Sequence, residues 1–314
     1  MSFSSDVKKE IGNIEADSCC LKSELYSIIR YKSKLKLSSS GLGITISTTL
    51  NVVARRIVYL FKLVYNEDLV IKVVKRNKLD YKDKYILDFN HDASKLIIDL
   101  KILNPDYSIN EQLNYDIIKK PCCKGALLRG LFLVQGSIND PATSNYHLEI
   151  ILDEKEDFDV LNSILNEVGI DSKLIQRKKG YILYIKKSEM IGDFLKFVGA
   201  NNSLFYFENQ RIMRDYNNSV NRIINCDISN EERVLKTSKQ QLANIEFLTK
   251  ARGIVNLPDR ILNAIVLRTT YPDYSLGELS DESEALVGKY ISKSGLSHCF
   301  KDIETMVNEL KGKK

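Results

Sequence analysis

Cysteine and histidine are the side chains best suited to binding a transition metal or acting as a nucleophile, and this chain has few of them. Its cysteines are Cys19, Cys20, Cys122, Cys123, Cys226 and Cys299, and its histidines are His91, His147 and His298. No two cysteines have the C-x-x-C spacing of a zinc site. Adjacent cysteines point in different directions and rarely bind one ion. We therefore interpret these cysteines as small buried residues, and expect neither a metal ion nor a cofactor.

Lysine and arginine form a second set of candidate residues, because their charges can bind phosphate. They cluster in two places: Lys72, Lys75, Arg76 and Lys78, and then Lys173, Arg177, Lys178, Lys179, Lys186 and Lys187. Both clusters lie in segments with the alternation of strands, so a sheet could present them to a nucleic acid. A solvated outer strand face would have the same composition, and the sequence leaves both interpretations open.

A third candidate set lies in the helical pattern from Leu204 to Arg252, which contains neither Pro nor Gly. Asn218, Asn221, Arg222 and Asn225 have the spacing i, i+3, i+4, i+7 and share one helix face. Asn and Arg commonly contact bases and phosphates. The same stripe could instead form hydrogen bonds with an adjoining domain or loop.

The fourth candidate set lies near the C-terminus. A helix is expected to begin near Ser292, with its buried stripe formed by Leu296, Phe300, Ile303, Met306 or Val307, and Leu310. Its other face carries Lys293, Ser294, Ser297, His298 and Lys301. An earlier helix is expected to begin at Leu257-Pro-Asp and to end before Pro272. Ser275 and Glu278 then form a capping box for a short helix, and a polar turn follows through Asp281–Glu284. Together these segments predict a helix-turn-helix unit, with its motif at about 275–308.

The charge of this last segment is unevenly distributed. Residues 255–314 contain eight Lys and Arg against nine Asp and Glu, a net charge of −1. From Val287 to Lys301, however, there are three lysines and no acid, whereas Asp281–Glu284 contains three acids. The helix that begins near Ser292 could therefore present a positive N-terminal end to the major groove of DNA.

An internal repeat must position most of these residues. Each Cys-Cys pair opens a similar segment, and the two segments begin 103 residues apart. The alternation that follows each segment predicts the order α-β-β-α-β-β-α, over about 19–105 and 122–200. Small residues fall at matching places in the two repeats, at Ser23 and Ser27 and at Ala126 and Gly130. We expect two helices to pack closely through these faces, along a pseudo-twofold axis.

The second repeat contains Leu128-Arg-Gly-Leu-Phe-Leu-Val-Gln-Gly136, which resembles the LAGLIDADG motif of homing endonucleases. Leu25-Tyr-Ser-Ile-Ile-Arg-Tyr-Lys-Ser33 is a weaker copy. The resemblance implies a saddle-shaped α+β domain in which an acid before the last residue of each motif holds catalytic metal ions. Here Lys32 and Gln135 occupy those positions, so no catalytic residue is expected, although relocated acids such as Glu24 or Asp140 would permit an active nuclease.

The combination of this duplicated domain with a C-terminal helix-turn-helix resembles the WhiA family of bacterial DNA-binding proteins. The resemblance is clearest at Leu128–Phe132, Gly136–Pro141, Tyr146–Glu149, Asn218–Arg222 and Ile291–His298. It implies a non-enzymatic regulator of transcription, involved in cell division and chromosome segregation and, in some lineages, sporulation. The expected partner is double-stranded DNA. The N-terminal domain could add nonspecific DNA contacts or bind a protein such as RNA polymerase or a sigma factor, and the sequence leaves both open. An alternative is a protein-interaction scaffold for the transcription machinery. Two departures bear on base preference: Cys299-Phe300 follows the histidine where family members commonly have basic residues, and Ser297 stands where Asn is common.

Composition sets the remaining limits. The chain is 44% hydrophobic, too apolar for a disordered protein, yet it has no run of roughly 18 apolar residues and no apolar leader. We expect a cytoplasmic, nucleoid-associated protein without a membrane span. The expected domains are the LAGLIDADG-like domain at 1–203, a helical connector at 204–253 and the helix-turn-helix domain at 254–314.

Overall fold

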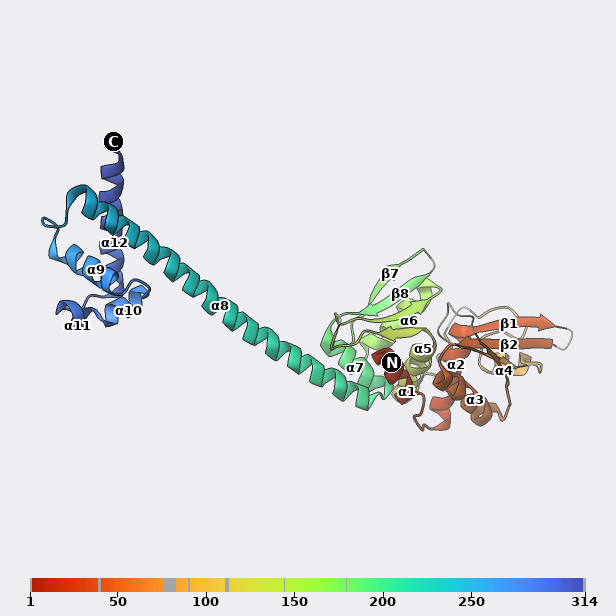
Figure 1. The fold of residues 1–314 in the computed structure, drawn as a ribbon. Coiled ribbons are helices and arrows are strands. Elements are labelled where there is room, and N and C mark those ends of the chain that lie inside the picture. The colour runs from red at the N-terminus through yellow and green to blue at the C-terminus, as the bar shows by residue number, and fades with distance from the viewer. Residues whose placement is uncertain are drawn as a thin grey trace. The chain divides into compact units, whose positions relative to one another are not determined.

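The chain forms two compact units, residues 1–215 and 216–314, and the boundary falls inside the long helix α8 (Asn201–Arg252). The computed structural model describes residues 2–38, 41–75, 83–89, 91–110, 113–143, 145–178 and 180–312 (Figure 1). No helix in these ranges combines the length and apolar character that a membrane span requires. The predicted domain limits at 203/204 and 253/254 stay predictions.

The first unit contains the predicted pair of repeats. The first repeat consists of α2 (Ser18–Lys32), β1 (Ser33–Ser38), β2 (Gly41–Thr48), α3 (Asn51–Tyr65), β3 (Val70–Val74), β4 (Lys84–Phe89) and α4 (Ser94–Asp99). The second consists of α5 (Pro121–Gln135), β5 (Gly136–Ile138), β6 (Leu148–Leu152), α6 (Lys155–Asn166), β7 (Lys173–Gln176), β8 (Tyr181–Ile185) and α7 (Ser188–Val198). Each repeat forms an antiparallel four-stranded sheet, in the orders β1-β2-β4-β3 and β5-β6-β8-β7. This confirms the predicted α+β fold with an αββαββα duplication.

Each sheet has one face toward the helices and one outer face. In β2, Leu42, Ile44 and Ile46 are buried, whereas the residues between them are only partly covered. The period of two therefore places the apolar half of the strand in the core and the polar half outside. The outer faces consequently carry the strand residues that could meet a ligand.

Helices α2 and α5 pack together along the centre of the first unit, and their small residues permit a very close approach (Figure 1). A Cβ atom on Gly130 would lie 2.5 Å from the carbonyl oxygen of Glu24 and 3.2 Å from the Cβ of Ser27. Ser23 donates a hydrogen bond of 2.7 Å across the interface to the carbonyl oxygen of Cys123. The predicted packing of the small-residue faces is confirmed.

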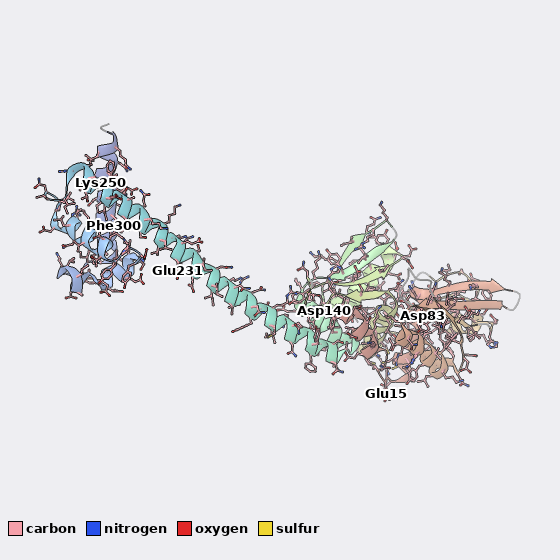
Figure 2. The ribbon with its side chains drawn as sticks, viewed as in Figure 1. Glu15, Asp83, Asp140, Glu231, Lys250 and Phe300 are labelled. Atoms are coloured by element: carbon pink, nitrogen blue, oxygen red, sulfur yellow. The ribbon has the colours of Figure 1, made fainter. Side chains whose placement is uncertain are left out.

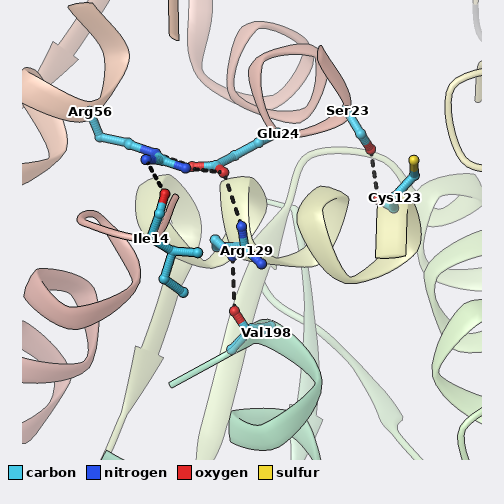
Figure 3. Close-up of polar contacts among 7 residues, drawn as sticks. All are labelled: Ile14, Ser23, Glu24, Arg56, Cys123, Arg129 and Val198. Carbon is cyan, nitrogen blue, oxygen red and sulfur yellow. Dashed lines mark hydrogen bonds and ion pairs between the residues drawn. The ribbon is translucent and has the colours of Figure 1, made fainter. Parts of the chain in front are cut away.

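A buried carboxylate joins these helices to α3. Glu24 is fully buried and accepts two hydrogen bonds from Arg56, at 2.7 and 2.8 Å (Figure 3). Arg129 of α5 approaches the same carboxylate at 3.4 Å and donates to the carbonyl oxygen of Val198. Arg56 also donates to the carbonyl oxygen of Ile14. Because Glu24 is held by two arginines, it belongs to the packing of the domain.

The same helix pair corrects the expectation for the cysteines. Cys19 and Cys20 begin α2, Cys122 and Cys123 begin α5, and the four Sγ atoms all lie within 4.8 Å of one another. Cys122 is exposed and Cys19 is half-buried, so the four are not simply core residues. The packing of α2 against α5 brings both pairs to a common point, so adjacent cysteines do converge here.

One helix of the first unit lies outside the predicted pattern. Helix α1 (Phe3–Ile11) buries Phe3, Val7 and Ile11, which have helical spacing, and Ser2 caps its N-terminus. The carboxylate of Glu10, near the end of α1, accepts hydrogen bonds from the backbone of Asn202 and Ser203. An acidic side chain thus caps the start of α8, where its negative charge interacts favourably with the positive end of the helix dipole.

The second unit is entirely helical in its described part. It contains the remainder of α8 together with α9 (Asp259–Thr270), α10 (Leu276–Asp281), α11 (Ser283–Val287) and α12 (Lys293–Gly312). Leu296, Phe300, Ile303 and Val307 of α12 are buried in its core, and Phe300 is labelled in Figure 2. The capping box of Ser275 and Glu278 is present. Part of the predicted polar turn instead forms α11, a short helix that the sequence analysis did not predict.

Neutralising Glu24 should destabilise the first unit. We expect Glu24→Gln to lower the free energy of unfolding by about 3–5 kcal/mol, because Arg56 and Arg129 would keep buried charges without a counter-ion. Urea-induced unfolding of the full chain, followed by circular dichroism, measures this loss. Asp68→Ala is the control, since it breaks the exposed pair of Lys62 and Asp68 and should cost less than about 1 kcal/mol. Equal losses in the two variants would contradict the role given to Glu24.

Candidate nucleic-acid interface

The five predicted contact residues of the C-terminal unit lie together on α12. Lys293, Ser294, His298 and Lys301 are exposed, and Ser297 is half-buried beside them. Their spacing places them on one face, opposite the buried stripe of the helix. The first two turns of α12 therefore present two ammonium groups, two hydroxyls and an imidazole to solvent.

A network of serines fixes where α12 begins. The hydroxyl of Ser280 donates to the carbonyl oxygen of Ile291 at 2.7 Å, and the backbone N–H of Ile291 donates to the hydroxyl of Ser283 at 2.8 Å. Ser283 in turn donates to the carbonyl oxygen of Ser280. Ser280 and Ser283 are buried, so these bonds are shielded from water. At the helix start itself, the Ser292 hydroxyl accepts from the N–H of Gly295.

A buried arginine holds the loop between α9 and α10. The guanidinium of Arg268 donates to the carbonyl oxygens of Tyr271, Pro272 and Tyr274, and to the side chain of Gln241. It also lies 5.6 Å from the centre of the Phe300 ring. Because Phe300 belongs to α12, this contact links the loop to the helix that carries the candidate residues.

The structure locates the two departures from the family pattern. Cys299 is buried in the core of the second unit, and this burial raises the pKa of its thiol. Its side chain therefore cannot contact a ligand on the exposed face of α12, and a change at Cys299 would act through packing. Ser297 lies at the margin of the candidate face, where its hydroxyl could take part in binding.

The five residues of the exposed face of α12 include two lysines and no acid. The positive end of the helix dipole adds to the charge of Lys293. The acid nearest Lys301 in the chain is Asp302, which forms an ion pair of 2.9 Å with Arg260. Because Asp302 is paired with Arg260, it does not neutralise the charge of Lys301. The exposed face of α12 therefore favours the binding of an anion.

The outer face of the first sheet carries more lysines than the sequence analysis identified. The register places Lys34 opposite Thr45, Thr45 opposite Asp88, and Asp88 opposite Val70. Lys36, Lys72 and Lys84 lie on the same face, because side chains alternate along each strand. The alternation Lys34-Leu35-Lys36-Leu37 was the signal that could have revealed two of them.

Of the predicted residues in this sheet, Lys72 and Lys75 are exposed, and Arg76 and Lys78 lie outside the described residues. The ammonium of Lys72 forms an ion pair of 2.9 Å with Asp88, which also accepts from Thr45. Burial alone would raise the pKa of Asp88, but these two hydrogen bonds outweigh it and lower the pKa. Lys72 is thus partly neutralised, whereas Lys34 and Lys36 add positive charge to the face.

The second sheet has a similar outer face. Arg177 and Lys178 are exposed, and Lys179 lies outside the described residues. Arg177 lies 3.9 Å from Glu149, which also accepts a hydrogen bond from Ser137. Lys173 pairs in register with Tyr184, and Lys186 lies 5.1 Å from the centre of the Tyr184 ring. One acid is therefore surrounded by basic and hydroxyl groups on each sheet.

The polar stripe of the long helix is open to solvent. Asn218, Asn221, Arg222 and Asn225 are all exposed on α8. They have the predicted common face and are available for a ligand.

The two positions where active homing endonucleases carry acids face each other in this chain. The ammonium of Lys32 donates to the Oε1 of Gln135 at 3.4 Å, and the Nε2 of Gln135 donates to the carbonyl oxygen of Tyr31. Beside them lies a pocket of about 240 Å³, lined by Lys8, Lys32, Ser47, Thr48, Thr49, Leu50, Lys84, Leu133 and Val134. Among the described residues, three lysines and no acid line this pocket, so it suits an anion and repels a divalent cation.

The two acids considered as relocated ligands lie elsewhere in the first unit. Glu24 is bound to Arg56 and Arg129, two helical turns before Lys32. Asp140 accepts a hydrogen bond from the backbone N–H of Ala142 and lies 3.4 Å from the hydroxyl of Tyr206. Neither acid lines the pocket beside Lys32.

Three family models match the chain in succession. They are the WhiA N-terminal LAGLIDADG-like domain at residues 18–103, the WhiA LAGLIDADG-like domain at 124–217 and the WhiA C-terminal HTH domain at 220–307. Among curated relatives, the probable cell division protein WhiA of Bacillus subtilis is 38% identical over 99% of this chain and 98% of its own length. The corresponding protein of Bacillus pumilus is 39% identical over the same shares.

The fold is also that of solved structures. The full-length WhiA protein of Thermatoga maritima aligns with a TM-score of 0.58 and 23% identity, over 98% of this chain and 99% of its own. The N-terminal LAGLIDADG domain of a WhiA protein aligns with a TM-score of 0.50 and 24% identity, over 63% of this chain and 90% of its own. Both likenesses concern the fold.

Stability should depend on the protonation of Lys8. Burial and the neighbouring charge of Lys32 lower the pKa of Lys8 to about 8, whereas an unfolded lysine has a pKa of about 10.4. Between these values the unfolded chain binds more protons, so stability should rise with pH from about 8 to about 10.4. Below pH 8 Lys8 is charged in both states, and its full destabilising effect is present.

Lys8→Met should remove this rise. Relative to the variant, we expect the wild type to gain at most about 3 kcal/mol of unfolding free energy across that window. Urea unfolding at several pH values measures the difference. Lys9→Met is the matched control, because Lys9 is the next residue of α1 and its side chain is 44% exposed. If the difference in unfolding free energy between the wild type and Lys8→Met is the same at every pH, the prediction is wrong.

Proposed function

Because the chain belongs to the WhiA family, we propose that it is a DNA-binding protein that regulates cell division without catalysing a reaction. The observation that carries this proposal is the exposed face of α12, with Lys293, Ser294, Ser297, His298 and Lys301. It lies at the positive N-terminal end of a helix in an HTH domain, where helices of this class enter the major groove.

The residues of this face have different roles. Lys293 and Lys301 place positive charges two turns apart, a separation that suits two phosphates of the DNA backbone. Ser294, Ser297 and His298 lie between them and offer short side chains that can form hydrogen bonds with base edges. The lysines thus supply affinity, and the residues between them supply sequence preference.

The first unit adds nonspecific contacts with the DNA backbone. The outer sheet faces carry Lys34, Lys36, Lys72, Lys84, Lys173, Arg177 and Lys186, while Lys75 and Lys178 follow at the strand ends. The exposed stripe of Asn218, Asn221 and Arg222 on α8, in the second unit, offers further contacts. The basic groups of the sheets recognise phosphate and carry little sequence information, so their loss should weaken binding to every duplex similarly.

The proposal that the chain is not a nuclease rests on the pair of Lys32 and Gln135. A metal-dependent nuclease needs carboxylates at this place, and the pocket beside the pair is lined by three lysines instead. A phosphate of the DNA backbone can occupy such a pocket. It would then lie where active homing endonucleases bind their metal ions.

The proposed role extends to transcription. As a regulator associated with the nucleoid, the protein would bind its target sites through α12 and influence RNA polymerase or a sigma factor nearby. Roles in chromosome segregation and, in sporulating lineages, in sporulation belong to the same proposal. Mapping of bound sites across the genome would identify the regulated genes.

Removing the two lysines should reduce both the affinity for DNA and its salt dependence. For Lys293→Ala/Lys301→Ala, we expect the slope of log K against log salt concentration to fall in magnitude by up to about 1.8, since each phosphate contact contributes about 0.9. Fluorescence anisotropy with random-sequence duplex DNA at several salt concentrations measures the slope.

The control is Lys250→Ala/Lys311→Ala, which removes the same charge. Lys250 forms an exposed pair with Glu246, and Lys311 lies in the last turn of α12. If the test variant and the control change the slope equally, α12 does not provide the contacts. A test variant with the wild-type slope would favour the alternative, a protein-interaction scaffold whose HTH domain does not touch DNA.

The wild-type protein should leave DNA intact. We expect no nicked or linear product when supercoiled plasmid is incubated with the protein and either Mg²⁺ or Mn²⁺, because no carboxylate lines the pocket beside Lys32 and Gln135. Gel electrophoresis reveals the products. Cleavage at a defined site that persists in Lys32→Ala but disappears in Asp140→Asn would establish the alternative, a nuclease with relocated acids.

A further inference from the structure

Four cysteines meet at the N-terminal ends of α2 and α5, at the opposite ends of these helices from Lys32 and Gln135. Cys19, Cys20, Cys122 and Cys123 have their Sγ atoms within 4.8 Å of one another. Two of them come from each repeat, and Cys19, Cys20 and Cys123 pack with Ala16 and Ala126. DNA binding by α12 or by the sheets gives these four thiols no role.

We propose that these four cysteines bind one zinc ion, which joins the two repeats at the start of their central helices. In a tetrahedral Cys₄ site the Zn–S distance is about 2.3 Å, so neighbouring sulfur atoms lie about 3.8 Å apart. Sulfur atoms within 4.8 Å of one another need to move by no more than about 1 Å to reach this geometry. The set also offers the all-thiolate donors that zinc prefers in structural sites.

The position of the cluster suits the charge of such a site. One Zn²⁺ with four thiolates has a net charge of −2, and each bound thiol releases its proton to solvent. All four cysteines lie in the first turns of α2 and α5, where two helix dipoles present their positive ends. The dipoles therefore favour the anionic complex on both sides of the pseudo-twofold axis.

The burial of the cluster is graded in a way that permits an ion to enter. Cys20 and Cys123 are buried, Cys19 is half-buried and Cys122 is exposed. The inner pair is held by the packing of the helices, and Ser23 of α2 hydrogen-bonds to the carbonyl oxygen of Cys123. An ion could thus bind first to the outer thiols and then to the fixed inner pair.

The principal competing outcome is disulfide formation between repeats. A disulfide needs only one partner for each sulfur, whereas here each sulfur lies near three others. This four-fold convergence favours an ion that binds all four sulfur atoms at once. The two states use the same atoms, so they exclude each other and an experiment can separate them.

The central test is metal binding by the full-length, metal-free protein under a thiol-free reductant. We expect one Zn²⁺ to bind per chain, and Co²⁺ in its place to give the thiolate charge-transfer and tetrahedral ligand-field bands of a CoS₄ centre. At free zinc of about 100 times Kd, the unfolding temperature should rise by roughly 5–10 °C. Absence of the cobalt bands from the folded wild-type protein would overturn the proposal by itself.

Serine variants identify the ligands. Cys19→Ser/Cys122→Ser changes the two more accessible thiols, and circular dichroism reports whether it folds as the wild type does. It should bind zinc at least 100-fold more weakly and lose the cobalt bands. Cys226→Ser, at an exposed cysteine of α8, is the matched control and should retain both. Equal zinc affinity in the two variants would refute the site, as would a reduced protein that binds no metal but forms disulfides among these cysteines on mild oxidation.

Discussion

The close approach of α2 and α5 is the constraint on which the rest of the first unit depends. Gly130 permits it, because any side chain there would meet the backbone of Glu24 at 2.5 Å. At that separation a serine of one helix can bond to the backbone of the other, and equivalent positions of the two repeats lie side by side. The ends of the helix pair then acquire opposite chemistry: thiols at the N-terminal ends, and the amide and ammonium of Gln135 and Lys32 at the C-terminal ends.

The helix pair also explains how a nuclease-like scaffold can accommodate a different use. The C-terminal ends of α2 and α5 bring two side chains into contact whatever those side chains are. With carboxylates the result would be a cation site; with Lys32 and Gln135, and with Lys8 and Lys84 nearby, it is a cationic pocket. The backbone geometry is retained, while the charge of the preferred ligand changes from positive to negative. Selection can therefore replace the chemistry of this site without disturbing the packing that creates it.

Local pattern was sufficient to predict most of the fold and one part of the candidate site. The 103-residue offset and the strand alternation gave both repeats, and the period of α12 separated Lys293 and His298 from the buried Phe300. Contacts between distant segments were beyond such reasoning. The convergence of the cysteine pairs depends on how two helices pack, and the partners of Glu24 lie 32 and 105 residues away. Lys34 and Lys36 alternate with leucine, as residues on the outer face of a strand do, but two lysines are a weaker sequence signal than the denser basic clusters.

The ion pair between the repeats has a consequence for how the two halves could ever exist apart. Glu24 is supplied by the first repeat and Arg129 by the second, and the matching positions, 103 residues away, are Leu127 and Tyr26. In a symmetric pair of first repeats, each Glu24 would keep Arg56 but lose its second arginine. In a symmetric pair of second repeats, each Arg129 would keep the carbonyl oxygen of Val198 but lose its carboxylate. The ion pair between the repeats therefore favours the pairing of each half with its diverged copy over the pairing of two identical halves.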